Sequence, residues 1–414
     1  MYSGSVIRGA TISGMANDSK PKAQTKDQQT KDWKTSLIHS DATVPAGFHS
    51  LSTPVYRGST VLFSQASAAS DRWNQYEVGY TYGLYGTPTT LELAAKVCEL
   101  EKGFRTIITP GGQAAISLIA LALLKSGDHV LMPESIYGPN RMFSNSVLRR
   151  FGVEVSYYPP DAGAAITAEL RPNTRLVWCE SPGSITMEVQ DVPAIVQAAH
   201  SRGALVALDN TWSAGIYLDA FALGVDVTMQ ALTKYVGGHS DLLLGSVTVR
   251  DEQIYNRLGE THQGLGCAAS PDDSSLALRG MKTMAVRLKA VEQSALVLAQ
   301  WLSRRPEIEL VLHPALPSCP GHEFWNRDFT GSSGLFSIVF DKRFSKEQVI
   351  AFVDALRLFK IGYSWGGVNS LVMTYDMQSP KRPAYGSRLV RLYTGLESIE
   401  DLTADVEQAL AAIR

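Results

Sequence analysis

The sequence predicts an α/β protein, with a mostly parallel central sheet covered by helices and a smaller C-terminal α+β domain. Two observations lead to this fold class. From about Leu91 onward, short apolar segments alternate with segments long enough for helices of about ten residues. Apolar strands of this kind are typical of parallel sheets buried between two layers of helices. After Gly280 the alternation ends, and one long helical pattern leads into mixed strands and helices.

The elements expected for the large sheet follow one another in regular order. Strands are predicted at 106–109, 129–132, 153–157, 176–180 and 204–208, and helices at 91–101, 113–124, 140–150 and 192–201. A further apolar run covers 225–231. Beyond it, helices are expected at 281–303, 346–356 and 402–413, and strands at 334–340 and 388–393. We therefore expect a tail and arm over 1–85, a large domain over 86–281 and a small domain over 282–414.

Composition excludes several classes of protein. The chain has 414 residues, 45% of them hydrophobic and 19% charged, with a formal net charge of −2. This balance is that of an ordinary globular protein, and it offers no basic surface for nucleic acid or an anionic membrane. Apolar stretches stop short of the roughly 20 residues that a membrane span needs. Residues 1–35 are polar and without periodicity, so we expect a mobile tail there.

Cysteine and histidine spacing favours neither a metal site nor a disulfide framework. The four cysteines are scattered without a CxxC pair, and the eight histidines show no HExxH spacing. Free cysteines of this kind are typical of a reducing compartment, so we expect a cytoplasmic protein without a metal.

Candidate functional residues follow the predicted strands, where sheets of this type bind ligands. Thr109-Pro110-Gly111-Gly112-Gln113 joins a strand to a helix, and a helix N-terminus there can bind a phosphate. Asp209 ends the strand at 204–208, and it either caps the next segment or pairs with a cationic ring nitrogen. Lys234 follows the run at 225–231. It is either a surface lysine or a desolvated amine able to form a Schiff base. Tyr137 either packs in the core or stacks on a planar cofactor.

In the order and placement of these four features, the chain resembles the Cys/Met-metabolism family of enzymes that use pyridoxal 5′-phosphate (PLP). The resemblance extends from about Asp41 to Arg414, and it is most specific in five stretches. These are Glu180–Ser184, Leu208–Trp212, Thr233–Tyr235 with Gly238–Asp241, His322–Phe336 and Tyr363–Gly367. The last two resemble the β-lyase branch of the family. The implied fold is the aspartate-aminotransferase-like fold of PLP-dependent transferases, called fold type I.

The resemblance also implies a role for each site residue. Lys234 would hold PLP covalently and later take the proton from the substrate Cα, Asp209 would pair with the ring nitrogen, and Tyr137 would stack over the ring. Gly112, Gln113 and Thr233 would hold the phosphate, together with Tyr82 of a neighbouring subunit. Arg391 would bind the substrate α-carboxylate, helped by Ser364, Trp365 and Tyr137. The family usually has an arginine two residues after Tyr82. Leu84 stands there instead, and we expect weaker PLP retention or compensation by Tyr85 or a basic residue elsewhere.

The activity implied for the β-lyase branch is α,β-elimination of L-cystathionine to L-homocysteine, pyruvate and ammonia, in methionine biosynthesis. The expected assembly is a homotetramer of two active-site-sharing dimers. A γ-synthase or γ-lyase would need the same PLP core, and racemisation would share removal of the Cα proton. A nicotinamide dehydrogenase is disfavoured because the chain lacks GxGxxG and would leave Lys234 and Asp209 without a role. A binding-only homologue without activity is disfavoured because Lys234, Asp209 and Arg391 are all present.

Overall fold

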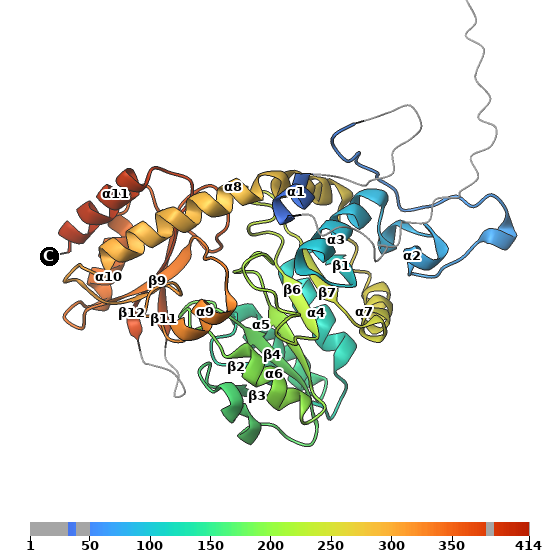
Figure 1. The fold of residues 1–414 in the computed structure, drawn as a ribbon, viewed down its shortest axis with the longest axis horizontal. Coiled ribbons are helices and arrows are strands. Elements are labelled where there is room, and N and C mark those ends of the chain that lie inside the picture. The colour runs from blue at the N-terminus through green and yellow to red at the C-terminus, as the bar shows by residue number, and fades with distance from the viewer. Residues whose placement is uncertain (1–31, 39–49, 378–384, 414) are drawn as a thin grey trace, which may run out of the picture.

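The computed structural model describes residues 32–38, 50–377 and 385–413 of the chain. Its centre is a seven-stranded sheet in the order β1-β7-β6-β5-β4-β2-β3 (Figure 1). The strands are β1 Arg105–Thr109, β2 His129–Pro133, β3 Glu154–Tyr158, β4 Thr174–Glu180, β5 Leu205–Asp209, β6 Val227–Gln230 and β7 Gly245–Val249. All neighbours from β3 to β6 pair in parallel, and β7 runs antiparallel to both β6 and β1. The predicted mostly parallel sheet is confirmed.

Helices cover both faces of this sheet. One face packs on α4 Gly112–Leu123 and α7 Glu252–Leu265. The other face packs on α3 Pro88–Glu101, α6 Val192–His200 and α8 Pro271–Leu302. Between β2 and β3 the chain forms α5 Gly138–Phe143 and continues as a π-helical stretch at Ser144–Leu148, where a single helix over 140–150 was predicted. The carboxyl ends of the parallel strands stay open, and the candidate site residues lie there.

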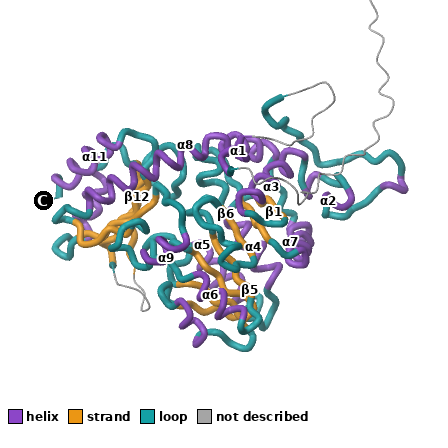
Figure 2. The backbone as a smooth tube through the Cα atoms, viewed as in Figure 1, coloured by secondary structure: helices purple, strands orange, loops and turns teal. Residues whose placement is uncertain are grey.

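A second sheet of five strands, in the order β10-β11-β12-β9-β8, forms the C-terminal part of the molecule. Figure 2 shows its strands in orange around β12, apart from the strands of the large sheet. Its strands are β8 Ile308–Leu312, β9 Leu335–Phe340, β10 Lys360–Ile361, β11 Leu371–Met377 and β12 Gly386–Tyr393. The second half of α8, α10 Lys346–Ala355 and α11 Ile399–Ala411 enclose a separate core with it. A short helix, α9 His322–Asp328, precedes β9. The sequence patterns did not reveal β7, α7, α9, β8, β10 or β11.

Helix α8 connects the two sheets (Figure 1). It begins at Pro271, ten residues before the predicted start, because Ser270 caps it and Asp272 and Asp273 occupy its first turn, next to the positive end of the helix dipole. The predicted start at 281 is therefore wrong. We propose that the boundary between the large domain (86–281) and the small domain (282–414) falls within this helix, since its two halves contact different cores.

The N-terminal part of the described chain is an arm, which we define as residues 50–85. It projects from the large sheet and carries the short helix α2 Gln75–Val78 and two 3-10 turns, Ala66–Ala68 and Gly83–Tyr85 (Figure 1). Most of the mobile tail predicted over 1–35 lies outside the described residues. Its last residues differ from that prediction, because α1 Trp33–Ile38 packs Trp33 and Leu37 against the core.

The helices and the cysteines of the described residues each bear on the class of protein. None of the helices in the described ranges is long and apolar enough to cross a membrane. All four cysteines are free, and Cys98, Cys179 and Cys319 are buried.

Candidate active site

A cavity of about 670 Å³ opens at the carboxyl ends of the parallel strands. It brings together every site residue predicted from the sequence except Tyr82. The lining residues among them are Gly112, Gln113, Tyr137, Asp209, Thr233, Lys234, Ser364, Trp365 and Arg391. The first six belong to the large sheet and its loops, and the last three come from the C-terminal part of the chain. The cavity is therefore built where the two parts of the molecule meet.

Among the described residues, Lys234 is the only lysine that lines this cavity. Its Nζ lies 2.5 Å from Ser364 Oγ and 5.4 Å from the centre of the Trp365 ring. The pKa of Lys234 is lowered to about 8, mainly by burial and also by the charge of Arg391, whereas Asp209 opposes the shift. A desolvated amine of this kind is a competent nucleophile and proton acceptor near neutral pH.

Asp209 is the last residue of β5, and its carboxylate faces the cavity. Thr211 holds it from the next turn, because the Thr211 amide and hydroxyl both donate to Asp209 Oδ1, at 3.0 and 2.5 Å. The same hydroxyl accepts the amide N–H of Ala231 at 2.9 Å, which connects the acid to the turn that carries Lys234. Burial raises the pKa of Asp209, while these hydrogen bonds and Lys234 act in the opposite direction. A cation placed here would stabilise the carboxylate.

The turn before α4 lines the cavity and packs closely on the turn that carries Lys234. Gly112 is the first residue of the helix, and a Cβ there would lie 2.7 Å from Ala231 Cβ. Gln113 Oε1 is buried and has no hydrogen-bond partner within the described part of the chain. Thr233 lies across the cavity, and its hydroxyl accepts the Leu244 amide N–H at 3.1 Å. The free N–H groups at the start of a twelve-residue helix bind an anion such as phosphate.

Tyr137 and Glu180 stand together at the ends of β2 and β4. The Tyr137 amide donates to Glu180 Oε2 at 2.7 Å, and the phenol ring lines the cavity with 40% of the residue exposed. Burial is the main cause that raises the pKa of the Tyr137 hydroxyl, so this group stays protonated at neutral pH. The ring is therefore available to stack on a planar group in the cavity.

Arg391 is a buried cation on β12 with 8% of its surface exposed. Its Nη1 donates to the Ser184 carbonyl at 3.1 Å, and its guanidinium lies 5.1 Å from the centre of the Tyr375 ring. A guanidinium can form a bidentate pair with a carboxylate, and its position in the cavity suits that role. The sequence patterns did not reveal Tyr375 as part of the site.

Residues 363–367 form a loop of the C-terminal part of the chain that contacts Lys234. Ser364 has a φ of +90°, an unusual backbone conformation for a residue with a side chain. Gly366 also has a positive φ, of +87°, and a Cβ there would lie 2.9 Å from Lys234 Cα. The loop therefore presses its backbone against the lysine while Ser364 and Trp365 face the cavity.

Tyr82 lies on the arm with 43% of the residue exposed and does not line the cavity of its own chain. Leu84 lines a different, small cavity beneath the arm. The Tyr85 hydroxyl donates to Asp71 Oδ1 and accepts from Gln263 Nε2, both at 2.9 Å. Because its proton is engaged within the chain, Tyr85 is a poor substitute for the arginine that Leu84 replaces.

Comparison with known proteins places these residues in a family. Residues 34–411 match the family of Cys/Met metabolism PLP-dependent enzymes. The chain belongs to this family. Its cofactor is pyridoxal 5′-phosphate, and the resemblance predicted from the strand-end residues is confirmed.

Individual relatives cover nearly the whole chain. Cystathionine beta-lyase of Escherichia coli is 39% identical over 92% of this chain and 98% of its own length. An L-alanine/L-glutamate racemase of Wolbachia pipientis is 35% identical over 88% of this chain and 93% of its own length. The crystal structure of metB from Corynebacterium glutamicum superposes with a TM-score of 0.84 and 30% identity, covering 93% of this chain and 99% of that one. The expected fold type I architecture is thereby confirmed.

The residues around the cavity fit PLP. The acid Asp209 suits the ring nitrogen, the Lys234 amine suits the aldehyde, and the free backbone N–H groups at the start of α4 suit the phosphate. Three supporting residues, Thr211, Glu180 and Tyr375, were missed as site residues. Thr211 was open to inference, because it lies two residues beyond Asp209 in the same turn. Tyr375 gave no sequence signal, since only the pairing of β11 with β12 brings it to Arg391.

Proposed function

We propose that this chain is a PLP-dependent carbon–sulfur β-lyase that cleaves L-cystathionine and water into L-homocysteine, pyruvate and ammonia. The observation that supports it most is the meeting of Lys234, Asp209, Arg391 and the N-terminus of α4 around one cavity. Relatives named cystathionine beta-lyase from three further bacteria, 38 to 41% identical, point to the same reaction.

Each residue has a defined task in this proposal. Arg391 binds the α-carboxylate of the amino acid and so orients the Cα–H bond. The free amine of Lys234, held near Ser364, accepts the Cα proton. Asp209 stays ionised and keeps a proton on the ring nitrogen. Bound PLP supplies the electron sink that makes the Cα proton acidic.

The elimination conserves electrons and protons, because Lys234 carries the proton that it removes. The electron pair left at Cα forms a double bond to Cβ, and the Cβ–S bond breaks with its electrons moving to sulfur. The Lys234 ammonium returns a proton to the departing thiolate, which leaves as homocysteine. Water hydrolyses the remaining enamine to pyruvate and ammonia. Tyr137, stacked over the cofactor ring, keeps the reacting atoms in one orientation.

The substrate and setting follow from the same proposal. The substrate is a small amino acid with a thioether at Cβ, and the process it serves is methionine biosynthesis. We place the enzyme in the cytoplasm, which its free cysteines suit. We further propose a homotetramer of two dimers, in which the exposed Tyr82 of each arm completes the partner's site.

Product analysis tests this proposal. The purified holoenzyme is given L-cystathionine, and pyruvate, 2-oxobutyrate and free thiol are measured over time. Equal amounts of pyruvate and thiol, both abolished by Lys234→Ala, are expected. Formation of 2-oxobutyrate instead would assign the enzyme to the γ-lyases of the family and overturn the proposed reaction.

Racemisation is a second candidate activity, favoured by the racemase relative. It shares the first step, because Lys234 removes the same Cα proton, and differs only in the face to which a proton returns. Incubation with L-alanine and chiral separation of the products measures it. Appearance of D-alanine that requires Lys234 would establish the side activity, and its absence would exclude it.

A further inference from the structure

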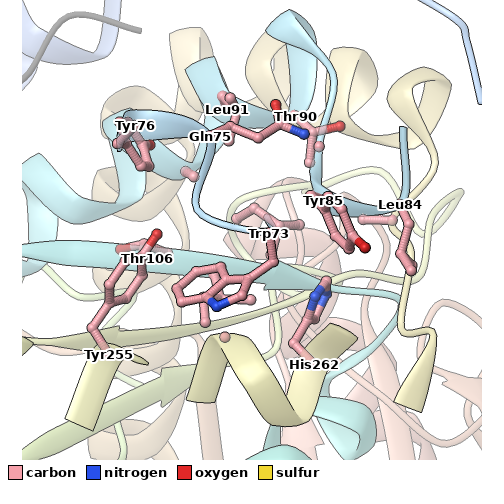
Figure 3. Close-up of a pocket in the computed structure, with 16 residues that line it drawn as sticks. Trp73, Gln75, Tyr76, Leu84, Tyr85, Thr90, Leu91, Thr106, Tyr255 and His262 are labelled. Carbon is pink, nitrogen blue, oxygen red and sulfur yellow. The ribbon is translucent and has the colours of Figure 1, made fainter. Parts of the chain in front are cut away.

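A tryptophan of the arm, Trp73, packs against helix α7 of the same subunit, in a notch left by Gly259. Trp73 lies beside the helix that carries Tyr255 and His262, which is α7 (Figure 3). At Gly259 of this helix a Cβ would come within 2.1 to 2.3 Å of three atoms of the indole ring. Tyr255 of the same helix meets the indole edge to face, with ring centres 5.2 Å apart. Because Gly259 has no side chain, the indole can lie directly on the helix backbone. Any side chain at this position would displace Trp73.

A second attachment lies one turn farther along α7. Gln263 Nε2 donates to the Tyr85 hydroxyl at 2.9 Å, and that hydroxyl donates to Asp71 Oδ1 at 2.9 Å. Figure 3 shows Tyr85 and Leu84 on the side of the small cavity where His262 lies. Trp73 and Tyr85 thus fix the arm to α7 at two points of the sequence that lie on either side of Tyr82.

The anchored segments hold Tyr82 directly. Gln75 is 2% exposed, and its Nε2 donates to the Tyr82 carbonyl at 3.0 Å. Thr81 Oγ1 donates to the Arg72 carbonyl at 2.9 Å, which joins the residue before Tyr82 to the residue before Trp73. The Tyr82 ring remains 43% exposed. The backbone of Tyr82 is therefore fixed while its phenol is presented outward.

We infer that the notch formed by Gly259 and filled by Trp73 is a positioning device, which holds Tyr82 where it can reach the cofactor phosphate of a second copy of this chain. The inference rests on the proposed function, in which the arm completes the neighbouring site. Leu84 increases the importance of Tyr82, because the side chain of Leu84 has no donor for a phosphate. Tyr82 then supplies the arm's phosphate contact at that site, and a small displacement of the arm loses it.

A pair of glycine substitutions on one helix tests the device. In Gly259→Ala the new methyl group collides with Trp73, whereas in Gly264→Ala the new methyl group meets nothing within 4 Å. Both glycines belong to α7 and neither has a positive φ, so alanine strains the backbone at neither position. PLP retention is measured by dialysis of the holoenzyme and by titration of PLP back into the protein. We expect Gly259→Ala to bind PLP about tenfold more weakly than the wild type, and Gly264→Ala to match the wild type.

Combination with Tyr82→Phe separates positioning from general damage. If the notch acts through Tyr82, the double variant Tyr82→Phe with Gly259→Ala retains PLP no worse than the weaker single variant. Fully additive losses would overturn the inference, as would unchanged PLP retention in Gly259→Ala. This readout needs no substrate, so it stays valid whichever product the enzyme forms from L-cystathionine.

A second variant covers the case in which Gly259→Ala fails to fold. Gln75→Met keeps the size of the side chain and removes only its donation to the Tyr82 carbonyl. Weaker PLP retention with an unchanged assembly in sedimentation supports the inference. PLP retention equal to the wild type in this variant contradicts it.

Discussion

At the scale of single residues, the site depends on groups whose charge is set by burial. The sequence predicted Lys234, Asp209 and Tyr137 because each follows a strand whose carboxyl end opens on the same edge of the sheet. It could not predict their partners. Thr211 joins Asp209 to the Lys234 turn through hydrogen bonds, and Tyr375 reaches Arg391 only through pairing of distant strands.

The pKa of Lys234 predicts a pH profile for the protein freed of PLP. Because this pKa is lowered to about 8, the amine is mostly protonated at pH 6 and mostly free at pH 9. The rate at which added PLP is captured should therefore rise with pH, with a midpoint near 8. Arg391→Met removes a positive charge that disfavours the ammonium form, so the midpoint should move upward. A profile that is flat between pH 6 and 9 contradicts this assignment.

Replacing the acid at Asp209 should abolish most activity without unfolding the protein. Asp209→Asn keeps the shape but removes the charge that pairs with the ring nitrogen, and we expect turnover to fall by about a hundredfold or more. Steady-state assays with L-cystathionine measure it, and Asp161→Asn, at an exposed position, serves as the control. Turnover within about threefold of the wild type would mean that Asp209 does not face the ring nitrogen.

At the scale of elements, the periodic segments were predictable and their neighbours were not. The alternating strands and helices from β1 to β5 follow from apolar runs and turn residues. Strand β7 was missed, although it is fully buried, because its short run Gly245–Val249 carries little periodicity. The early start of α8 was missed because polar residues fill its first turns, and Ser270 identifies the true cap.

Helix α8 also supports the turn that carries the lysine. Arg287 is 6% exposed, and its Nη2 donates to the carbonyls of Tyr235 and Gly280 at 2.9 and 2.7 Å. Arg287→Met leaves these buried carbonyls without their donor, and we expect a loss of about 2–4 kcal/mol in the free energy of unfolding. Urea unfolding of the holoenzyme measures it. Arg279→Met, at an exposed position of the same helix, should change stability by less than about 0.5 kcal/mol, and equal losses in both variants would refute the role of Arg287.

At the scale of the whole molecule, the two sheets meet around one cavity, and we propose that the arm completes the cavity of a second copy. The large sheet supplies the cavity residues that we propose for the cofactor, and the second sheet and its loops supply Arg391 and Ser364. The arm presents Tyr82 away from the cavity of its own chain. Composition and periodicity could not predict this arrangement, because it depends on contacts between parts of the chain that are far apart in sequence.

The proposed sharing of sites between copies predicts complementation. Lys234→Ala inactivates the site of its own chain but keeps an intact arm, and Tyr82→Phe has the converse defect. Co-expression should produce mixed dimers in which one of the two sites is fully intact, so the separated mixed species should have about half the activity of the wild type. Separate purification of the mixed species by two affinity tags and assay of pyruvate formation checks it. Activity equal to the mean of the two parents would show that each chain completes its own site.

Chemical fixation of the cofactor tests the central claim most directly. The PLP-loaded enzyme is reduced with borohydride, digested, and searched by mass spectrometry for the lysine that carries the phosphopyridoxyl group. We predict that the modified peptide contains Lys234 and that Lys234→Ala yields no stoichiometric modification. A cofactor fixed to any other lysine would place the active site outside the cavity between the two sheets and contradict the account.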